Sequence, residues 1–426
     1  MTAQSSAQQQ DRSGFFDQFR LLTRYPNFGL LWTGQVISHL GDAFYSIALI
    51  WLVQEMTGSR TMMGAISATV SATALFGLVA GALVDRWDRR LTMFFSDVLR
   101  ALAILTLPVL ALLGQLELWH LFVVGAVMGL LAQLFYPAKQ ALLPHLVSRA
   151  DLTGANALSH MAFLLLTAAG YGLGGLLLSV MTAPELFTFD AVTFGVSALT
   201  IWLIRMPRAQ PAEPTGEGQA EEGAASSGLW QDILEGLRYV RQDALIATVI
   251  PVSLIANFIF APLTVLLAAW AKDVVQAGAL GYGLLEGSFL IGSLVGTLSV
   301  NALTARFHRG KLVVWGVIFM GLPLVLFAFI PNIYLDSALL AVIGLMNGIV
   351  NISIITVFQQ RVPDVMMGRV FGLLIGLGML AVPLGIALGG IAADYVSLSY
   401  LFAALGVAMT LIGLSLFRQP AVAELA

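Results

Sequence analysis

Long apolar runs follow one another along most of this chain and restrict its fold more than any other feature. A bilayer core about 30 Å thick is crossed by a helix of roughly 20 mostly apolar residues. Charged residues make up only 11% of the 426 residues, whereas a soluble protein carries about 25%. The runs are continuous, unlike the short alternating strands of a membrane barrel. The sequence therefore predicts an all-α membrane protein with many spans.

About twelve transmembrane helices are expected, in two halves of six. They are predicted near residues 28–55, 62–84, 91–114, 118–138, 153–181, 185–206, 244–270, 280–304, 312–331, 335–360, 367–392 and 396–417. The expected domains are a cytoplasmic N-terminal segment (1–27), a first half (28–206), a cytoplasmic linker (207–243), a second half (244–417) and a cytoplasmic tail (418–426).

The predicted linker has two parts. Residues 207–228 are rich in Pro, Gly, Ala and Glu without an apolar period, which is typical of a flexible connection. The stretch that follows is amphipathic, with apolar residues on one helical face: Leu229, Ile233, Leu237 and Val240. We expect this second part to form a helix over 229–242 on the inner membrane surface.

Lysine and arginine indicate the orientation, because they concentrate on the cytoplasmic side of membrane proteins. If the N-terminus is cytoplasmic, Arg60 and Lys272 fall outside and Arg100 lies within a predicted helix, which leaves 18 of the 21 on the inner side. We therefore expect a multi-pass protein of the inner or plasma membrane with both termini in the cytoplasm.

The two predicted halves are related by a shift of about 219 residues. The shift aligns identical residues: Trp51 with Trp270, Gly125 with Gly344, Gly129 with Gly348, Gln140 with Gln359, and Pro144 with Pro363. Two repeated six-helix halves joined by a linker are the organisation of major facilitator transporters.

One charged stretch makes that resemblance specific. GALVDRWDRR resembles the signature between the second and third helices of the major facilitator superfamily, with matches at Gly81, Asp85, Arg86, Arg89 and Arg90. Asp88 replaces the usual glycine. The continuation to Asp97 and Arg100, and the stretches NFGLLWTGQVISHLGDAF, FDAVTFGVSAL and VPDVMMGRVFG, resemble the macrolide-efflux and enterobactin-exporter-like branch of drug:proton antiporters.

In that superfamily the signature stabilises the outward-facing state. The resemblance implies a cytoplasmic gate in which Asp85 meets the N-terminus of the eleventh helix, where a carboxylate is favourable by about 0.3–1 kcal/mol. The other members of this predicted gate are Arg86, Arg89, Arg90, Asp97 and Arg100. The alternative is that these arginines only follow the cytoplasmic preference for positive charge.

A second partial match lies in the fifth predicted helix. AAGYGLGG resembles an antiporter signature, with Gly170, Gly174 and Gly175 in place but Tyr171 where proline is usual. Pro383 lies in a comparable glycine-rich stretch of the eleventh helix. Glycines at this spacing let helices approach closely, so plain packing is the alternative to a transport role.

Charged and polar residues within the predicted spans are candidates for coupling and substrate binding. An ionised carboxylate at a helix centre costs about 2.5–3.5 kcal/mol on insertion scales. Asp42 and Glu286 are therefore candidates for proton coupling. The alternative for Asp42 is a structural carboxylate, and the alternative for Glu286 is a water-exposed one. The candidates for a substrate cavity are Gln35, His39, Gln133, Asn257, Phe258, Asn347 and Asn351.

We therefore expect a secondary active transporter, a proton-coupled antiporter that exports hydrophobic or amphipathic small molecules by alternating access. The alternatives are an uptake symporter for a metabolite and an exporter of lipid or siderophore. An enzyme is not expected, because no nucleophile–base set is apparent. The absence of cysteine and the scattered histidines argue against a metal site, and no cofactor is expected. The expected partners are the bilayer, the substrate and protons, with no nucleic acid, and the protein is expected to be a monomer.

Overall fold

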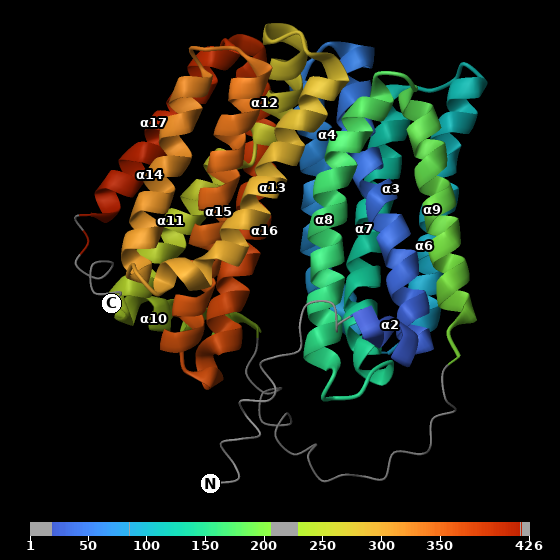
Figure 1. Cartoon of the computed structure of the whole chain (residues 1–426), viewed down its shortest axis with the longest axis horizontal. Coiled ribbons are helices and arrows are strands. Elements are labelled where there is room, and N and C mark those ends of the chain that lie inside the picture. Colours follow the sequence, from blue (N-terminus) through green and yellow to red (C-terminus); the bar gives the residue numbers. More distant parts are fainter. Residues whose placement is uncertain (1–18, 85, 206–228, 418, 420–426) are drawn as a thin grey trace. The chain divides into compact units, whose positions relative to one another are not determined.

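The computed structural model describes residues 19–84, 86–205, 229–417 and 419. Within these residues, 11 helices are long and apolar enough to cross a membrane, which confirms the predicted all-α membrane fold (Figure 1). The helix predicted near 62–84 is instead divided into α4 (Arg60–Ala72), η3 (Thr73–Phe76) and α5 (Gly77–Val84). These consecutive elements of 13, 4 and 8 residues are together long enough for one further span.

The first of two compact units comprises residues up to Leu49 and Phe76–Arg205. Besides α5, its elements are α2 (Arg20–Arg24), α3 (Pro26–Thr57) up to Leu49, α6 (Arg89–Leu112), α7 (Leu118–Leu142), η4 (Leu143–His145), α8 (Leu152–Leu178) and α9 (Ala183–Leu203). In this unit α6 packs on both α7 and α9.

The second unit comprises Ile50–Leu75 and the residues from Met206 onward. It contains the end of α3, α4, α10 (Leu229–Gln242), α11 (Ala244–Phe260), α12 (Leu263–Ala269), η5 (Trp270–Val274), α13 (Gly278–Thr304), α14 (Arg309–Phe327), α15 (Ile333–Arg361), α16 (Asp364–Tyr395) and α17 (Leu398–Leu416). The segment Ile50–Leu75 joins this unit because α4 packs along α16. The domain boundaries expected from the sequence stay a prediction.

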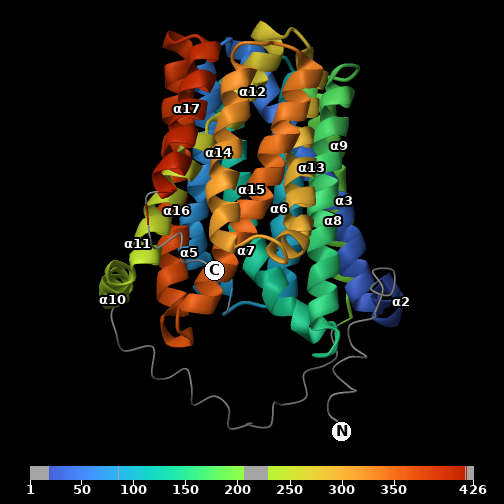
Figure 2. The same cartoon turned by 60° about the vertical axis from the view of Figure 1, so that its left-hand side comes forward.

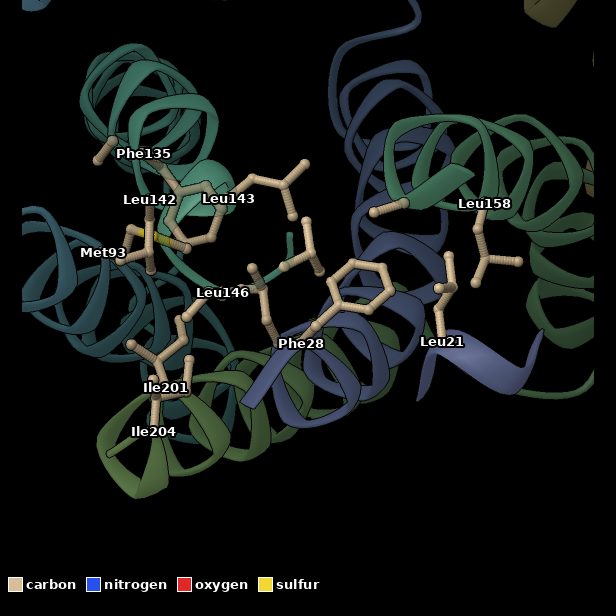
Figure 3. Close-up of a cluster of buried hydrophobic side chains, with 14 of the residues drawn as sticks. Leu21, Phe28, Met93, Phe135, Leu142, Leu143, Leu146, Leu158, Ile201 and Ile204 are labelled. Carbon is tan, nitrogen blue, oxygen red and sulfur yellow. The ribbon is translucent and has the colours of Figure 1, made fainter. Parts of the chain in front are cut away.

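A cluster of buried apolar side chains holds one end of the first unit together (Figure 3). Phe28 of α3, Met93 of α6 and Phe135 of α7 meet there, each at most 6% exposed. Ile201 and Ile204 add the end of α9. Because the members come from helices far apart in sequence, burying them fixes the packing of α3 and α6–α9.

Glycines set the closest helix contact of the second unit, between α13 and α15. Gly292 and Gly296 on α13 are four residues apart, and so are Gly344 and Gly348 on α15. A β-carbon on Gly344 would overlap the carbonyl oxygen of Phe289, and each of the other three would overlap backbone of the facing helix in the same way. The backbones can therefore meet only where side chains are absent, as in other membrane helix pairs with small residues four apart.

The beginning of α4 is capped from another helix. Asp394, near the end of α16, accepts hydrogen bonds from the backbone N–H of Arg60 (3.0 Å) and Thr61 (3.0 Å). The Arg60 guanidinium donates to the Ala393 carbonyl oxygen (2.6 Å) and pairs with Asp273 of η5 (2.7 Å). First-turn N–H groups have no partner within their own helix, so Asp394 supplies what α4 lacks.

Helix α10 has the bounds predicted from its amphipathic pattern. Figure 2 shows that it lies crosswise to α11 instead of continuing its axis. Between the two helices, Asp243 accepts hydrogen bonds from the N–H groups of Leu245 (2.9 Å) and Ile246 (3.1 Å) and pairs with Arg361 at the end of α15 (2.7 Å). Glu235, near the middle of α10, also pairs with Arg369 of α16 (2.7 Å), so ion pairs hold α10 at its middle and just beyond its C-terminal end.

Replacing Gly344 or Gly348 by alanine should lower the free energy of unfolding by about 1–3 kcal/mol, because the added methyl group overlaps backbone that cannot move without separating α13 from α15. Thermal unfolding in detergent would measure the loss. Gly172→Ala is the matched control, since a β-carbon at Gly172 meets no atom within 4 Å. Equal effects at the three positions would contradict a packing role for the glycine pairs.

The Asp243 cap should respond to pH. Partial burial alone would raise the pKa of the Asp243 carboxyl, but hydrogen bonds from Arg361 and the Ile246 N–H hold that pKa below its ordinary value. Because the pKa is lower in the folded state than in the unfolded state, the stabilisation is present above about pH 4 and is lost as the pH falls through the folded-state pKa.

Two substitutions separate the ion pair from the cap. Asp243→Asn keeps an acceptor for the N–H groups and should cost about 0.2–1 kcal/mol, because Arg361 is partly in solvent. Asp243→Ala should cost about 1 kcal/mol more. Thermal unfolding at pH 7 and below pH 4 would test both, and a cost of Asp243→Asn that stays constant with falling pH would contradict the assignment.

Candidate functional site

Two arginines of the signature stretch bind the ends of neighbouring helices. Arg89 and Arg90 open α6, and their guanidinium groups donate to backbone carbonyl oxygens. The acceptors are Ala141 (3.2 Å) for Arg89, and Ile201 (3.1 Å) and Trp202 for Arg90. Carbonyl groups at helix C-termini lack intrahelical partners and attract cations. Both arginines thus tie α6 to the ends of α7 and α9, while their predicted part in a gate stays a prediction.

Asp88, which replaces the usual glycine of the signature, is the N-cap of α6. Its Oδ1 accepts the N–H of Leu91 at 2.8 Å. Arg86 and Trp87 are exposed and line an open groove along α6 and α7. Asp85, the central residue of the predicted gate, lies outside the described residues.

Asp97 and Arg100 are buried inside the first unit. Asp97 is fully buried and Arg100 is 6% exposed, with Nη1 of Arg100 3.5 Å from Oδ1 of Asp97. The guanidinium carbon lies 4.9 Å from the ring centre of Phe135 and 5.2 Å from that of Phe194. The cation–π contacts and the paired charge offset part of the cost of removing Arg100 from water, while Nε and Nη2 of Arg100 have no hydrogen-bond partner among the described residues.

A chain of polar side chains extends from this pair across the first unit. Ser197 of α9 donates to Asp97 (2.6 Å), and the amide nitrogen of Gln35 approaches Ser197 Oγ at 3.5 Å. Lys139 of α7 donates to Gln35 Oε1 at 3.3 Å. Four helices, α3, α6, α7 and α9, therefore meet through polar contacts as well as through apolar packing.

The two predicted proton-coupling residues have different surroundings. Asp42 lies at the middle of α3 with 43% of its side chain exposed, and Nδ1 of His39 is 3.8 Å from Oδ2 of Asp42. Glu286 on α13 is only 9% exposed, and its Oε1 has no hydrogen-bond partner among the described residues. Asp42 is thus reachable from outside the unit, whereas Glu286 is enclosed.

The described second unit contains a partly open cavity between α11, α14, α15, α16 and α17, with a volume of about 310 Å³. Three of the predicted cavity residues line it: Asn257, Asn347 and Asn351. Ser253 is the fourth polar residue of the lining, and valine, isoleucine, leucine, methionine, alanine and phenylalanine side chains form the rest. Apolar walls with a few convergent polar groups are typical of sites for organic ligands.

The structure places the other predicted cavity residues elsewhere. Phe258 is 38% exposed and does not line this cavity, although its neighbour Asn257 does. Gln133 of α7 lies beside Gly77 at the start of α5. Gln35 and His39 border a much smaller space of about 10 Å³ in the first unit, together with Lys139.

The predicted glycine motif of α8 faces α3. A β-carbon on Gly170 would crowd Ala43, and one on Gly174 would crowd Phe44. Gly175 is buried beside them, and Pro383 lies within α16. Gly170 and Gly174 therefore allow close packing of α8 on α3, while a part of this motif in transport stays a prediction.

Three groups of interest were not among the sequence candidates: Lys139, Ser197 and the Asp394 cap. Asp190, Thr193 and Ser197 recur every three or four residues along α9, a spacing that places them on one face. That pattern could have identified a polar face inside the bundle. Asp394 gives no comparable signal, because the segment that it caps is more than 300 residues away in the chain.

Removing one partner of the buried Asp97–Arg100 pair should destabilise the protein by about 3–5 kcal/mol, because the other charge stays buried without compensation. We expect Arg100→Met to lower the unfolding temperature more than the double variant Asp97→Asn/Arg100→Met does. Thermal unfolding of both in the same detergent is the measurement. A double variant at least as unstable as Arg100→Met alone would contradict direct pairing.

The chain resembles known transport proteins over almost its whole length. Residues 22–425 match the model of the family described as transmembrane secretion effector. The chain is 30% identical over 393 residues to the multidrug efflux pump Tap of Mycolicibacterium fortuitum, covering 90% of this chain and 93% of that protein. It is 24% identical over 392 residues to macrolide efflux protein A of Streptococcus pyogenes, covering 89% and 94%.

Solved structures show the same fold at low sequence identity. The nucleoside transporter NupG matches with a TM-score of 0.68 at 13% identity, over 92% of this chain and 98% of that one. A bacterial homologue of the iron transporter ferroportin matches with a TM-score of 0.67 at 17% identity, over 92% and 98%. These matches and the family model confirm the resemblance seen in the sequence: the chain belongs to the transmembrane secretion effector family of the major facilitator superfamily, and it is a multi-pass membrane transporter.

Proposed function

We propose that the protein exports hydrophobic or amphipathic drug-like molecules. The observation that carries this proposal is the cavity of the second unit, whose walls are apolar apart from Ser253, Asn257, Asn347 and Asn351. Such a lining favours organic molecules over sugars or inorganic ions, which need more polar contacts. The relatives named as a multidrug efflux pump and as a macrolide efflux protein support the same substrate class.

Export would be driven by protons taken up at Asp42 or Glu286. A carboxylate held within a membrane span is expensive while it is ionised and unpaired, and binding a proton removes that cost. Glu286 is buried without a partner for Oε1 among the described residues, and Asp42 is reachable from outside its unit. Either arrangement supports a group that changes protonation during the cycle.

The proposal includes an orientation and an assembly state. The charge asymmetry of the sequence favours both termini in the cytoplasm of a cell whose inner or plasma membrane holds the protein. We propose that a single chain transports by alternating access, with a cytoplasmic gate around the stretch Gly81–Arg90. Proteolysis of inverted membrane vesicles at residues 207–228 would locate the linker.

Transport by purified protein in proteoliposomes tests the exporter and its coupling together. An imposed proton gradient should drive movement of a fluorescent amphipathic dye and of a macrolide, and a protonophore should stop it. Asp42→Asn or Glu286→Gln should slow gradient-driven transport by about tenfold or more, equivalent to roughly 1.4 kcal/mol. Glu55→Gln is the matched control, since Glu55 is an exposed carboxylate at the end of α3 that accepts a hydrogen bond from Trp51.

The outcomes separate the alternatives. Dye movement at a rate that does not depend on the imposed proton gradient would contradict proton coupling. Movement of labelled lipid instead of dye would favour a lipid exporter, and gradient-driven accumulation of a metabolite in the opposite direction would favour an uptake symporter. Normal coupling in both carboxylate variants would remove Asp42 and Glu286 from the mechanism.

A further inference from the structure

We propose that the cavity of the second unit selects molecules, or parts of molecules, that are uncharged and that both donate and accept hydrogen bonds. The inference rests on the proposed function, because it names the chemical class that the exporter would bind at this cavity. It separates neutral, hydrogen-bonding ligands from charged and from fully apolar ones, which neither the fold nor the apolar walls alone would do.

The first support is the absence of charge. Asp, Glu, Lys, Arg and His do not occur among the described residues that line the cavity. A charged group bound against these walls would lose part of its hydration without meeting an opposite charge, which is unfavourable beside apolar side chains. Multidrug recognition by an acidic residue that attracts cations therefore does not apply to this cavity.

The second support is the arrangement of the polar groups. Ser253 and Asn257 are four residues apart on α11, and Asn347 and Asn351 are four residues apart on α15. Residues at this spacing lie on one face of a helix, one turn apart. Each helix thus presents a short polar pair to the cavity between apolar neighbours.

The third support is that these groups have unused hydrogen-bonding capacity. The Ser253 hydroxyl is buried and has no hydrogen-bond partner among the described residues. Asn257 and Asn351 are exposed and Asn347 is half-buried. None of the three makes a side-chain hydrogen bond within the described part of the chain, so their amides are open to a ligand that displaces water, whereas Asn27, Asn156 and Asn332 each make one. Each amide offers two donors and one acceptor oxygen.

These features penalise two kinds of ligand. A fully apolar molecule would fill the space but leave the amides and the hydroxyl unpaired, which is costly when water is displaced. A charged molecule would lack a counter-charge. A neutral amide, alcohol or ketone on an apolar body satisfies both requirements. The volume of about 310 Å³ suits one or two fused rings with a polar substituent, or one such part of a larger molecule.

A matched set of naphthalene compounds tests how the charge of the ligand affects its binding. Binding of 1-naphthylacetamide, 1-naphthylacetate and (1-naphthylmethyl)trimethylammonium to the purified full-length protein in lipid nanodiscs would be measured by calorimetry. The apolar body is the same in all three. We expect the amide to bind about tenfold more tightly than either ion. Equal or tighter binding of either ion, or no measurable binding of the amide, would overturn the inference.

Variants then assign the discrimination to this cavity. Asn347→Leu and Asn351→Leu should each weaken binding of the amide by about two- to tenfold, and Asn347→Asp should shift the preference toward the ammonium compound. Asn156→Leu, on α8 of the first unit, is the matched control and should leave the order unchanged. Amide binding that all the cavity variants preserve would overturn the assignment. Unfolding temperatures measured in parallel identify a variant that fails to fold, in which case Asn347→Gln and Asn351→Gln replace the leucine variants.

Transport of the same compounds separates this inference from the proposed function. Selective binding of the amide without export would contradict the exporter but leave the cavity assignment intact. Export of all three compounds at equal rates, unaffected by the asparagine variants, would support an exporter and overturn the selectivity.

Discussion

Backbone groups at helix ends have no hydrogen-bond partner in their own helix, and polar groups between helices have little water to bind, so both constrain the packing of this chain. Several helix ends are completed by side chains from other helices. Arg90 binds carbonyl oxygens at the end of α9, Asp394 caps the start of α4, and Asp243 links the start of α11 to the end of α15. Each such contact supplies hydrogen bonds that a helix end lacks and also holds that helix against a neighbouring helix.

The two units meet the same constraint differently. The first carries its polar groups inside, where Asp97, Arg100, Ser197, Gln35 and Lys139 form a chain across four helices. Within this group, Oδ1 of Asp97 and Nε and Nη2 of Arg100 are buried without a hydrogen-bond partner among the described residues. The second unit leaves several amides and a hydroxyl facing a cavity with no protein partner among the described residues. Both units therefore hold polar atoms without a hydrogen-bond partner among the described residues, and in the second unit such groups line a cavity.

Much of the fold could be predicted from the sequence because its signals are local. Apolar runs gave the spans, and the amphipathic period gave the bounds of α10. The sequence did not predict the break of one expected helix into α4, η3 and α5. The Asp394 cap joins distant segments, and no pattern near either end indicates it. Within the candidate site, Asn347 and Asn351 could be grouped by their spacing, whereas the orientation of Phe258 away from the cavity depends on how α11 is rotated by its neighbours.

The signature stretch shows why a family motif and a physical role are separate questions. Asp88 departs from the family pattern, yet its carboxylate caps α6. A glycine at this position would have no side chain to accept that hydrogen bond. Arg89 and Arg90 match the pattern and hold α7 and α9 in place. A substitution at either arginine would therefore loosen the first unit as well as any gate. Loss of transport in such a variant becomes evidence for gating only when the unfolding temperature is unchanged, which makes stability the first measurement for this stretch.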